Sequence, residues 1–328
     1  MALPPVWFER PPLDEFAVEV AGVCTVLGPS ADDVDAGLET ALGVIAGSRA
    51  YDAVVMDRAP ALRVIARTGI GYDGVDVVAA TDRGIAVCNT PDGPTVSTAE
   101  HAMGLLIAVT KQIPRSQAAL RDGTPGYFAG HQGIELDGKS LGLVGFGRIA
   151  RHVARIAGGL GMRVSFVDPF VDPTAVPAGV TRVASLEALL AAADVVSVHV
   201  PLTAATAGMF GAAQFGAMKP GAVFVNTARG GLVDNDALLA ALESGHLFGA
   251  GLDVTAPEPL PVDHPLLGRD DVLVTPHIAS ATREGKARMF RSAFAQAMAV
   301  IEGRRPEHLV NPEVWERIST TLQAGVGR

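Results

Sequence analysis

The clearest chemical pattern in the sequence is a glycine-rich turn, GFGRIA at residues 145–150, which follows the apolar run LGLV and precedes a helical stretch. The first glycine permits a tight turn from strand to helix, and the second lets the backbone approach a pyrophosphate, while Ala150 is small enough for a close helix–strand contact. Amides at the helix start then hold the anion. The turn therefore predicts a dinucleotide site that includes Gly145, Gly147, Arg148 and Ile149.

An acidic residue completes this pattern. Asp168 ends the strand-like run MRVSFV and lies 21 positions after Gly147. Its carboxylate would accept hydrogen bonds from the adenosine ribose and would repel a 2′-phosphate. The next residues are Pro169 and Phe170 rather than Arg or Lys, so the sequence favours NAD over NADP. The alternative interpretation of Asp168 is an ordinary residue of a turn at the end of a strand.

His277 is the side chain best suited to move a proton. It follows the apolar run VLVT, and the ends of parallel strands are where the ligand crevice of an α/β sheet lies. Imidazole titrates near neutrality without a large perturbation, which suits a group that donates and accepts protons. The alternative is a capping or solvated histidine, which is how we interpret most of the other seven.

Composition restricts the class of protein. The 328 residues carry 26 Lys and Arg against 35 Asp and Glu, a net charge of −9, and no basic block, which argues against a nucleic-acid partner. The longest apolar stretch, Ala102–Val109, is far short of the about 20 residues that a bilayer requires. The N-terminus lacks the apolar core of a signal peptide. Cys24 and Cys88 form neither a disulfide framework nor a metal-binding CxxC, so we expect a cytoplasmic protein without a metal.

The elements that must position these residues alternate between short apolar runs and Ala/Leu-rich helical stretches, which is typical of an α/β fold. Six strands are expected, at 141–145, 162–167, 194–200, 222–226, 249–254 and 272–275, and they predict a doubly wound parallel sheet. One expected helix covers residues 237–244 and is capped by Gly245. A second runs from 283 to about 301.

The first hundred residues predict a smaller α/β domain, with strands at 18–27, 43–46, 62–67 and 85–88. Ser97 and Glu100 form an S-x-x-E capping box, after which a helix should run until Pro114 bends or ends it. The C-terminal helix returns the chain to the first domain. We therefore expect a discontinuous domain of residues 1–110 and 286–328, interrupted by a nucleotide-binding domain of residues 111–285.

Four blocks resemble the D-isomer-specific 2-hydroxyacid dehydrogenase family, in particular its phosphoglycerate dehydrogenase and hydroxypyruvate reductase branches. They are RTGIGYDGVD (67–76), NTPDGPTVSTAEHA (89–102), NTARGGLVD (226–234) and the region 251–280, which includes APEP and TPHIAS. The resemblance implies a Rossmann domain inserted into a flavodoxin-like substrate domain, with a cleft between them. It also implies a homodimer formed through the NAD-binding domain.

The family resemblance assigns the reacting groups. The reaction moves a hydride between nicotinamide C4 and C2 of a D-2-hydroxy acid or 2-keto acid. Arg229 matches the family arginine, whose forked donors take the substrate carboxylate and carbonyl oxygen. His277 matches the proton donor and acceptor. Glu258, 19 residues earlier, matches the acid that stabilises the imidazolium and fixes the ring.

The resemblance also extends to residues that bind without reacting. Gly69, Ile70 and Gly71 would present amides to the substrate carboxylate, although an ordinary turn explains these glycines equally well. Seven further residues would surround the cofactor, with Asp253 contacting the nicotinamide carboxamide: Thr98, Pro201, Thr227, Ala228, Asp253, Ala279 and Ser280.

Two departures from the family concern the substrate. Thr255 stands where relatives often have an aromatic or larger apolar residue, and Asp92-Gly93-Pro94 changes the usual glycine-rich sequence after NTP. A phosphorylated substrate would need further cations, for which Arg49, Arg58 and Arg67 are candidates. Two other functions stay open, namely an NAD-sensing corepressor-like protein and a formate or phosphite dehydrogenase on the same fold.

Overall fold

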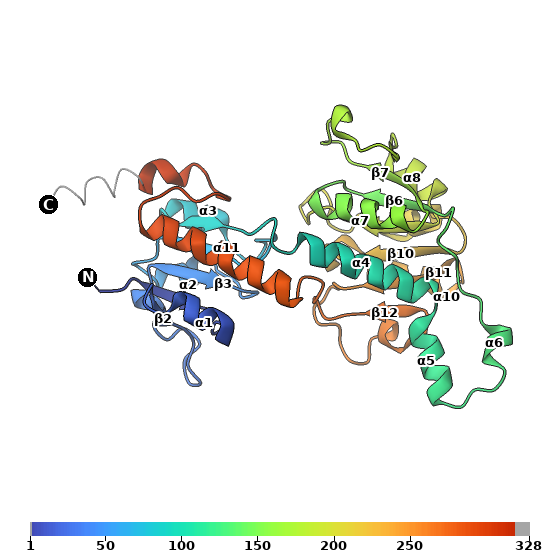
Figure 1. Ribbon diagram of the computed structural model, residues 1–328, viewed down its shortest axis with the longest axis horizontal. Coiled ribbons are helices and arrows are strands. Elements are labelled where there is room, and N and C mark those ends of the chain that lie inside the picture. The colour runs from blue at the N-terminus through green and yellow to red at the C-terminus, as the bar shows by residue number, and fades with distance from the viewer. Residues whose placement is uncertain (1, 319–328) are drawn as a thin grey trace. The chain divides into compact units, whose positions relative to one another are not determined.

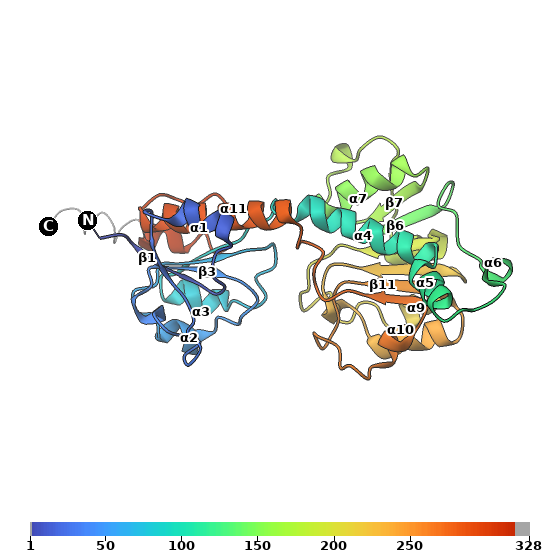
Figure 2. The same cartoon turned by 60° about the horizontal axis from the view of Figure 1, so that its bottom comes forward.

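The computed structural model describes residues 2–318, which form two compact units (Figures 1 and 2). Unit 1 consists of residues 2–94 and 283–318, and unit 2 of residues 95–282. The chain therefore leaves unit 1, forms unit 2 without interruption and returns through one long helix.

Unit 1 is built on a five-stranded parallel sheet in the order β2-β1-β3-β4-β5. This is the 2-1-3-4-5 order of flavodoxin-like folds, as the family resemblance implies. Its elements are β1 (Pro5–Phe8), α1 (Asp14–Val20), β2 (Thr25–Leu27), η1 (Leu38–Thr40), β3 (Gly43–Ala46), α2 (Ala53–Asp57), β4 (Val64–Arg67), α3 (Val77–Asp82), β5 (Ala86–Cys88) and α11 (Arg283–Ile301).

Helices cover both faces of this sheet. On one face α1 and α11 lie side by side, with the Phe16 and Phe290 rings stacked at 4.4 Å (Figure 1). On the other face α2 and α3 contribute Met56 and Ala80 to a second apolar cluster. Because both faces are buried, the strands are nearly continuous apolar runs rather than alternating ones.

Two local predictions in unit 1 are wrong. The expected strand at 18–27 is instead the end of α1 followed by β2, because Phe16 and Val20 have helical i, i+4 spacing and are buried together. The sequence prediction also included no strand at the position of β1. As the first residue of the strand, Pro5 needs no backbone donor. The predicted helix from 283 to about 301 is confirmed by α11.

Unit 2 contains a seven-stranded parallel sheet in the order β12-β11-β10-β9-β6-β7-β8. Read from β8, the sheet runs 3-2-1-4-5-6-7 in chain order, the Rossmann arrangement with one added strand. Its strands are β6 (Ser140–Val144), β7 (Arg163–Val167), β8 (Val180–Arg182), β9 (Val195–Val198), β10 (Ala222–Asn226), β11 (Leu247–Leu252) and β12 (Val272–Val274).

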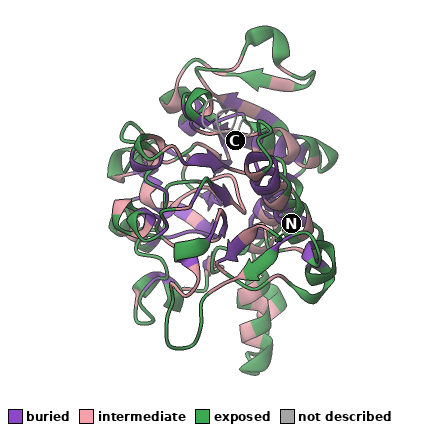
Figure 3. Cartoon of the chain, turned by 90° about the vertical axis from the view of Figure 1, so that its left-hand side faces the viewer, coloured by how far each residue is buried: buried purple, intermediate pink, exposed green. Residues whose placement is uncertain are grey.

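Two apolar clusters sandwich the sheet of unit 2. The helices of the first cluster are α4 (Thr95–Thr110) and α7 (Arg148–Gly159), and those of the second are α8 (Leu186–Ala192), α9 (Ala212–Ala217) and α10 (Asn235–Glu243). Figure 3, which views the molecule from the side of unit 1, shows that buried residues gather on the central strands and that exposed residues lie mainly on helices, loops and edge strands. The predicted α/β class with a doubly wound parallel sheet is confirmed.

Helix α4 differs from the prediction in two respects. It begins at Thr95, so Ser97 lies inside the first turn, where its hydroxyl bonds Thr282 Oγ1 at 2.7 Å instead of capping the helix. The helix also belongs to unit 2, because its apolar face packs on α7, β10 and β11. The units therefore divide at 94/95 and 282/283, whereas the sequence placed the boundaries at 110/111 and 285/286.

The helices that follow α4 project from unit 2. Helix α5 (Ile113–Arg121) begins with Pro114 in its first turn, where proline is tolerated, so this proline starts a helix rather than bending one. Neither α5 nor α6 (Tyr127–Gly130) contains a buried residue. Among residues 2–318, no helix combines the length and the apolar character needed to cross a membrane.

Candidate active site

The glycine-rich turn connects β6 to α7 at the point where the strand order of unit 2 reverses. Gly145 has φ +89°, and a Cβ there would lie 2.8 Å from the carbonyl oxygen of His199, which follows the neighbouring strand β9. Only glycine fits both conditions. A Cβ on Gly147 would meet open space, so protein atoms do not explain that glycine. Ligands of open α/β sheets bind at this switch point.

Helix α7 starts without a side-chain cap. Its N-cap is Gly147, which supplies no side-chain acceptor, and Arg148 is the first helical residue. Ala150 is fully buried against the sheet, as its place in the turn predicts. The N-terminus of a twelve-residue helix with no side-chain cap is a suitable partner for a pyrophosphate.

Asp168 lies directly after β7 and is tied to the glycine turn. Its Oδ2 accepts a hydrogen bond from the Phe146 amide, and its Oδ1 accepts one from the Phe170 amide, each at 2.8 Å. It also lines a cavity of about 540 Å³ with Val167, Pro169, Arg182, Val183 and Ala184. The cavity has room for the adenosine end of a dinucleotide.

The other residues expected around the cofactor lie at strand ends and in loops of unit 2, except that Thr98 is in the first turn of α4 and Arg148 and Ile149 begin α7. Thr227, directly after β10, is buried, and its hydroxyl has no hydrogen-bond partner in the described part of the chain. An orphaned buried hydroxyl at this edge fits a site completed by a ligand. Ala279 and Thr98 are buried, Ile149, Ala228 and Ser280 are half-buried, and Pro201 and Arg148 are exposed. The residues present therefore fit a dinucleotide.

Glu258 and His277 meet in the structure. Nδ1 of His277 lies 2.6 Å from Oε1 of Glu258, and both side chains are about two-fifths exposed. His277 has φ +53°, a left-handed conformation that is rare for residues other than glycine and clusters at functional sites. Because Glu258 occupies Nδ1, Nε2 is the ring nitrogen left to exchange a proton.

Asp253 fixes the loop that carries His277. Its carboxylate, which is fully buried, accepts hydrogen bonds from the Ile278 amide at 2.9 Å, the Ala279 amide at 2.8 Å and Thr275 Oγ1 at 2.6 Å. The His277 amide donates to the Asp253 carbonyl oxygen at 2.8 Å. Burial alone would raise the pKa of Asp253, but these bonds and one with His101 lower it, so the group stays ionised.

This network gives Asp253 protein partners that the sequence analysis did not predict. The sequence placed its carboxylate against the nicotinamide carboxamide, whereas in the structure the carboxylate is buried and bound to residues 275–279. Sequence reasoning did not assign Thr275 to the site, and it placed His101 only among histidines that could line the cleft, whereas its Nε2 lies 2.9 Å from Thr275 Oγ1. Both stand in family blocks, and the block position was the only signal available.

Arg229 lies in a turn after β10 that packs against the segment leading to Glu258. A Cβ on the next residue, Gly230, would lie 2.0 Å from the carbonyl group of Thr255, so only glycine permits this approach. The side chain of Thr255 is buried and donates a hydrogen bond to the Pro257 carbonyl oxygen at 2.9 Å. The half-buried Arg229 side chain donates to the Ala228 carbonyl oxygen at 2.7 Å. Arg229, Glu258 and His277 all lie within residues 95–282 and thus belong to unit 2.

His199 is not an alternative proton carrier. The residue is half-buried, and Nε2 lies 2.9 Å from Ser197 Oγ. Burial lowers the pKa of His199 to about 4, so the ring is neutral at neutral pH. The part of His199 that the glycine turn contacts is its carbonyl oxygen.

The expected substrate loop follows β4 in unit 1. The Thr90 amide donates to the Gly69 carbonyl oxygen at 2.9 Å, and Asn89 Nδ2 donates to the Ile70 carbonyl oxygen at 2.7 Å. Gly69, Ile70 and Gly71 are half-buried. Both bonds hold the loop through its carbonyl oxygens and involve none of its amides.

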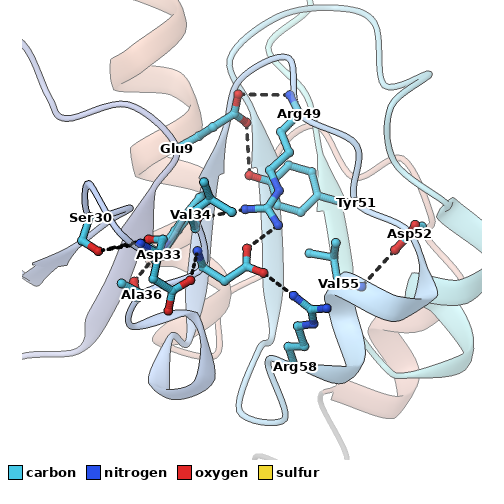
Figure 4. Close-up of polar contacts among 12 residues, drawn as sticks. Glu9, Ser30, Asp33, Val34, Ala36, Arg49, Tyr51, Asp52, Val55 and Arg58 are labelled. Carbon is cyan, nitrogen blue, oxygen red and sulfur yellow. Dashed lines mark hydrogen bonds and ion pairs between the residues drawn. The ribbon is translucent and has the colours of Figure 1, made fainter.

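A polar cluster shown in Figure 4 accounts for two of the candidate phosphate ligands. Arg49 and Arg58 both pair with Asp35, the latter at 2.6 Å. Burial by itself would raise the pKa of Asp35, but the two arginines lower it below its ordinary value. Glu9, missed from the sequence, accepts hydrogen bonds from the Ser48 and Arg49 amides and from Tyr51 Oη. In residues 2–318, no group of three or more His, Cys, Asp or Glu side chains is arranged to hold a metal ion.

Comparison with known proteins agrees with this geometry. Residues 103–279 match the family model described as D-isomer specific 2-hydroxyacid dehydrogenase, NAD binding domain, which confirms NAD as the expected cofactor. A D-3-phosphoglycerate dehydrogenase of Archaeoglobus fulgidus is 42% identical over 243 residues, 74% of this chain and 46% of that protein. The chain thus spans about half the length of that relative.

Two further relatives match over most of their length. A glyoxylate reductase of Korarchaeum cryptofilum is 43% identical over 268 residues, 80% of each chain. The crystal structure of TT0316 protein from Thermus thermophilus is similar with a TM-score of 0.84 and 42% identity, covering 93% of this chain and 99% of that one. The chain therefore belongs to the D-isomer specific 2-hydroxyacid dehydrogenase family.

Proposed function

We propose that this protein is an NAD-dependent oxidoreductase that interconverts a D-2-hydroxy acid and the corresponding 2-keto acid. The observation that carries the proposal is the contact of 2.6 Å between His277 and Glu258, at the end of a strand in a dinucleotide-binding unit. When bound, NADH supplies the hydride that reduces C2 of the substrate. The protein's own side chains supply the rest of the chemistry.

His277 moves the proton. During reduction, its Nε2 donates a proton to the substrate carbonyl oxygen, which becomes the hydroxyl group, and the ring becomes neutral. During oxidation, the same nitrogen takes the hydroxyl proton. Glu258 favours the protonated ring and orients it through Nδ1.

Arg229 binds and polarises the substrate. Its planar guanidinium can bond the substrate carboxylate and the carbonyl oxygen together, which a lysine ammonium cannot do with the same geometry. The turn that holds Arg229 rests on the backbone of Thr255, three residues before Glu258. Amides of Gly69, Ile70 and Gly71 would add donors to the carboxylate.

The substrate we favour is a small, unphosphorylated 2-keto acid such as glyoxylate or hydroxypyruvate. The relatives include both a glyoxylate reductase and a D-3-phosphoglycerate dehydrogenase. Of the three candidate phosphate ligands, Arg49 and Arg58 are paired with Asp35. Thr255 adds little bulk and is turned into the protein by its bond to Pro257.

The test is a substrate panel followed by NADH absorbance. Glyoxylate, hydroxypyruvate, pyruvate and 3-phosphohydroxypyruvate are compared in wild type and in His277→Ala, with formate and phosphite plus NAD⁺ as further arms. We expect turnover with a small keto acid, reduced at least about a hundredfold by His277→Ala because general acid catalysis is lost.

Other outcomes of the panel identify the competing functions. Tight NADH binding without turnover of any keto acid would support an NAD-sensing protein, and NAD⁺ reduction by formate or phosphite would support the third function. A strong preference for 3-phosphohydroxypyruvate would overturn the proposed substrate class while leaving the reaction type in place.

We also propose a homodimer formed through unit 2. Helices α5 and α6 contain no buried residue, although they carry the large apolar side chains of Leu120 and Phe128, which are 84% and 95% exposed. Exposed apolar side chains on a projecting segment are typical of a subunit interface. Light scattering should give the mass of two chains, and the double variant Leu120→Glu, Phe128→Glu should give one. A monomeric wild type would refute the proposal.

A further inference from the structure

The cavity beside Asp168 contains a cation that the sequence prediction did not consider. Strand β8 was not expected, and Arg182 is its last residue. It lies next to β7, where the register pairs it with Phe166, two residues before Asp168. Arg182 and Asp168 therefore stand at the carboxyl ends of neighbouring parallel strands and line one cavity.

Asp168 is less able to exclude an anion than a free carboxylate. Each of its oxygens accepts a backbone amide, from Phe146 and from Phe170, both at 2.8 Å. Amide donors stabilise the negative charge and offset part of its field. Repulsion of a 2′-phosphate by Asp168 is correspondingly weaker than the sequence fingerprint alone suggests.

Arg182 has donors available for a ligand. It is exposed, and its Nη1 donates to the Val171 carbonyl oxygen at 3.1 Å. Within residues 2–318, no carboxylate lies within 4 Å of its guanidinium nitrogens. One hydrogen bond leaves most of the guanidinium donors for another acceptor. In dinucleotide folds, an arginine near the ribose accommodates the 2′-phosphate of NADP.

We propose that Arg182 forms a 2′-phosphate subsite, so that the protein binds NADP(H) as well as NAD(H). Asp168 favours the ribose hydroxyls of NAD, and Arg182 favours the added phosphate, so the preference between the dinucleotides is set by these two side chains. The inference rests on the dinucleotide-binding part of the proposed function and is independent of which acid is reduced.

The experiment measures binding without turnover. Dissociation constants of NADH and NADPH are obtained by fluorescence titration for wild type, Arg182→Gln and the control Arg163→Gln. Arg163 is an exposed arginine at the opposite end of β7, so its replacement removes the same charge away from the cavity. Thermal unfolding checks that each variant is folded.

Arg182→Gln should raise the ratio of the NADPH to the NADH dissociation constant by about tenfold or more, because a charge-assisted hydrogen bond is lost. Arg163→Gln should leave the ratio unchanged. Arg182→Lys, which keeps the charge but not the fork, should fall between them. Asp168→Asn should move the ratio in the opposite direction from Arg182→Gln.

Adenosine fragments isolate the subsite. In competition against NADH, 2′-phospho-AMP should lose affinity relative to AMP in Arg182→Gln only. The proposal is overturned when the ratio changes no more in Arg182→Gln than in Arg163→Gln, or when wild type fails to bind NADPH at concentrations that saturate it with NADH. Failure to bind NADH itself would instead overturn the proposed function.

Discussion

Nδ1 of His277 lies 2.6 Å from Oε1 of Glu258, although 19 residues separate them in the chain. The contact orients the ring and leaves Nε2 for the substrate. It also gives the protonated ring a compensating charge. The backbone at His277 has a left-handed conformation, and the network around Asp253 holds it there.

Replacing Glu258 by Gln should lower turnover. The amide keeps the size of the side chain but removes the charge that faces Nδ1 of His277, so the ring loses the partner that orients it and compensates the imidazolium. We expect kcat to fall at least about tenfold. Glu313→Gln, at an exposed position, is the matched control. An unchanged kcat in Glu258→Gln would contradict the assigned role.

The left-handed conformation of His277 predicts that glycine is better tolerated there than alanine. Both His277→Gly and His277→Ala remove the imidazole, so both should abolish proton transfer. The glycine variant should be more stable by about 1 kcal/mol, because a Cβ is strained at this φ. Chemical denaturation of the two variants provides the comparison, and equal or reversed stabilities would show that the backbone relaxes when the ring is removed.

The sequence predicted the chemistry of the site better than its geometry. Arg229, Glu258 and His277 could be named from family blocks, but the distance between Glu258 and His277 depends on how two loops at the sheet edge pack. The hydrogen bonds of Asp253 were not predicted for the same reason. Its four partners come from α4 and from the segment after β12, so no local pattern reports that the carboxylate is buried.

The fold was predicted where the sequence contains clear runs of apolar residues. The six expected strands of unit 2 all exist, because buried parallel strands are long apolar runs. Strand β8 was missed because its residues, Val180–Arg182, are half-buried or exposed at the edge of the sheet. In α1 the β-branched residues suggested a strand, but burial of Phe16 and Val20 on one helical face overrides that propensity.

The carboxylate of Asp253 should contribute to both stability and turnover. Asp253→Asn replaces an acceptor by a donor that faces backbone amides, so we expect a loss of about 2 kcal/mol or more in the free energy of unfolding. The loop with His277 would be less well fixed, which should lower kcat more than it weakens NADH binding. Thr275→Val removes only one hydrogen bond to this carboxylate and should have a smaller effect. Equal effects of the two variants would show that the carboxylate charge is unimportant.

Asp194, the residue directly before β9, predicts a stability effect that depends on pH. Burial by itself would raise its pKa, but bonds from Lys219 and from the amide and hydroxyl of Ser140 lower the pKa to about 2. Because the folded value lies below the ordinary value of 3.8, the ionised form stabilises the fold above about pH 4. This contribution is lost as the pH falls through about 2.

Asp194→Asn should therefore be less stable than wild type by about 1 kcal/mol at pH 7, where the ion pair with Lys219 is intact. The difference should shrink between about pH 4 and pH 2, because protonation of Asp194 then removes the same interactions from the wild type. Denaturant unfolding across this range measures it, and Asp263→Asn, at an exposed position, controls for the change in net charge. A difference that stays constant down to pH 2 would mean that packing around the carboxyl group, rather than its ionisation, stabilises the start of β9.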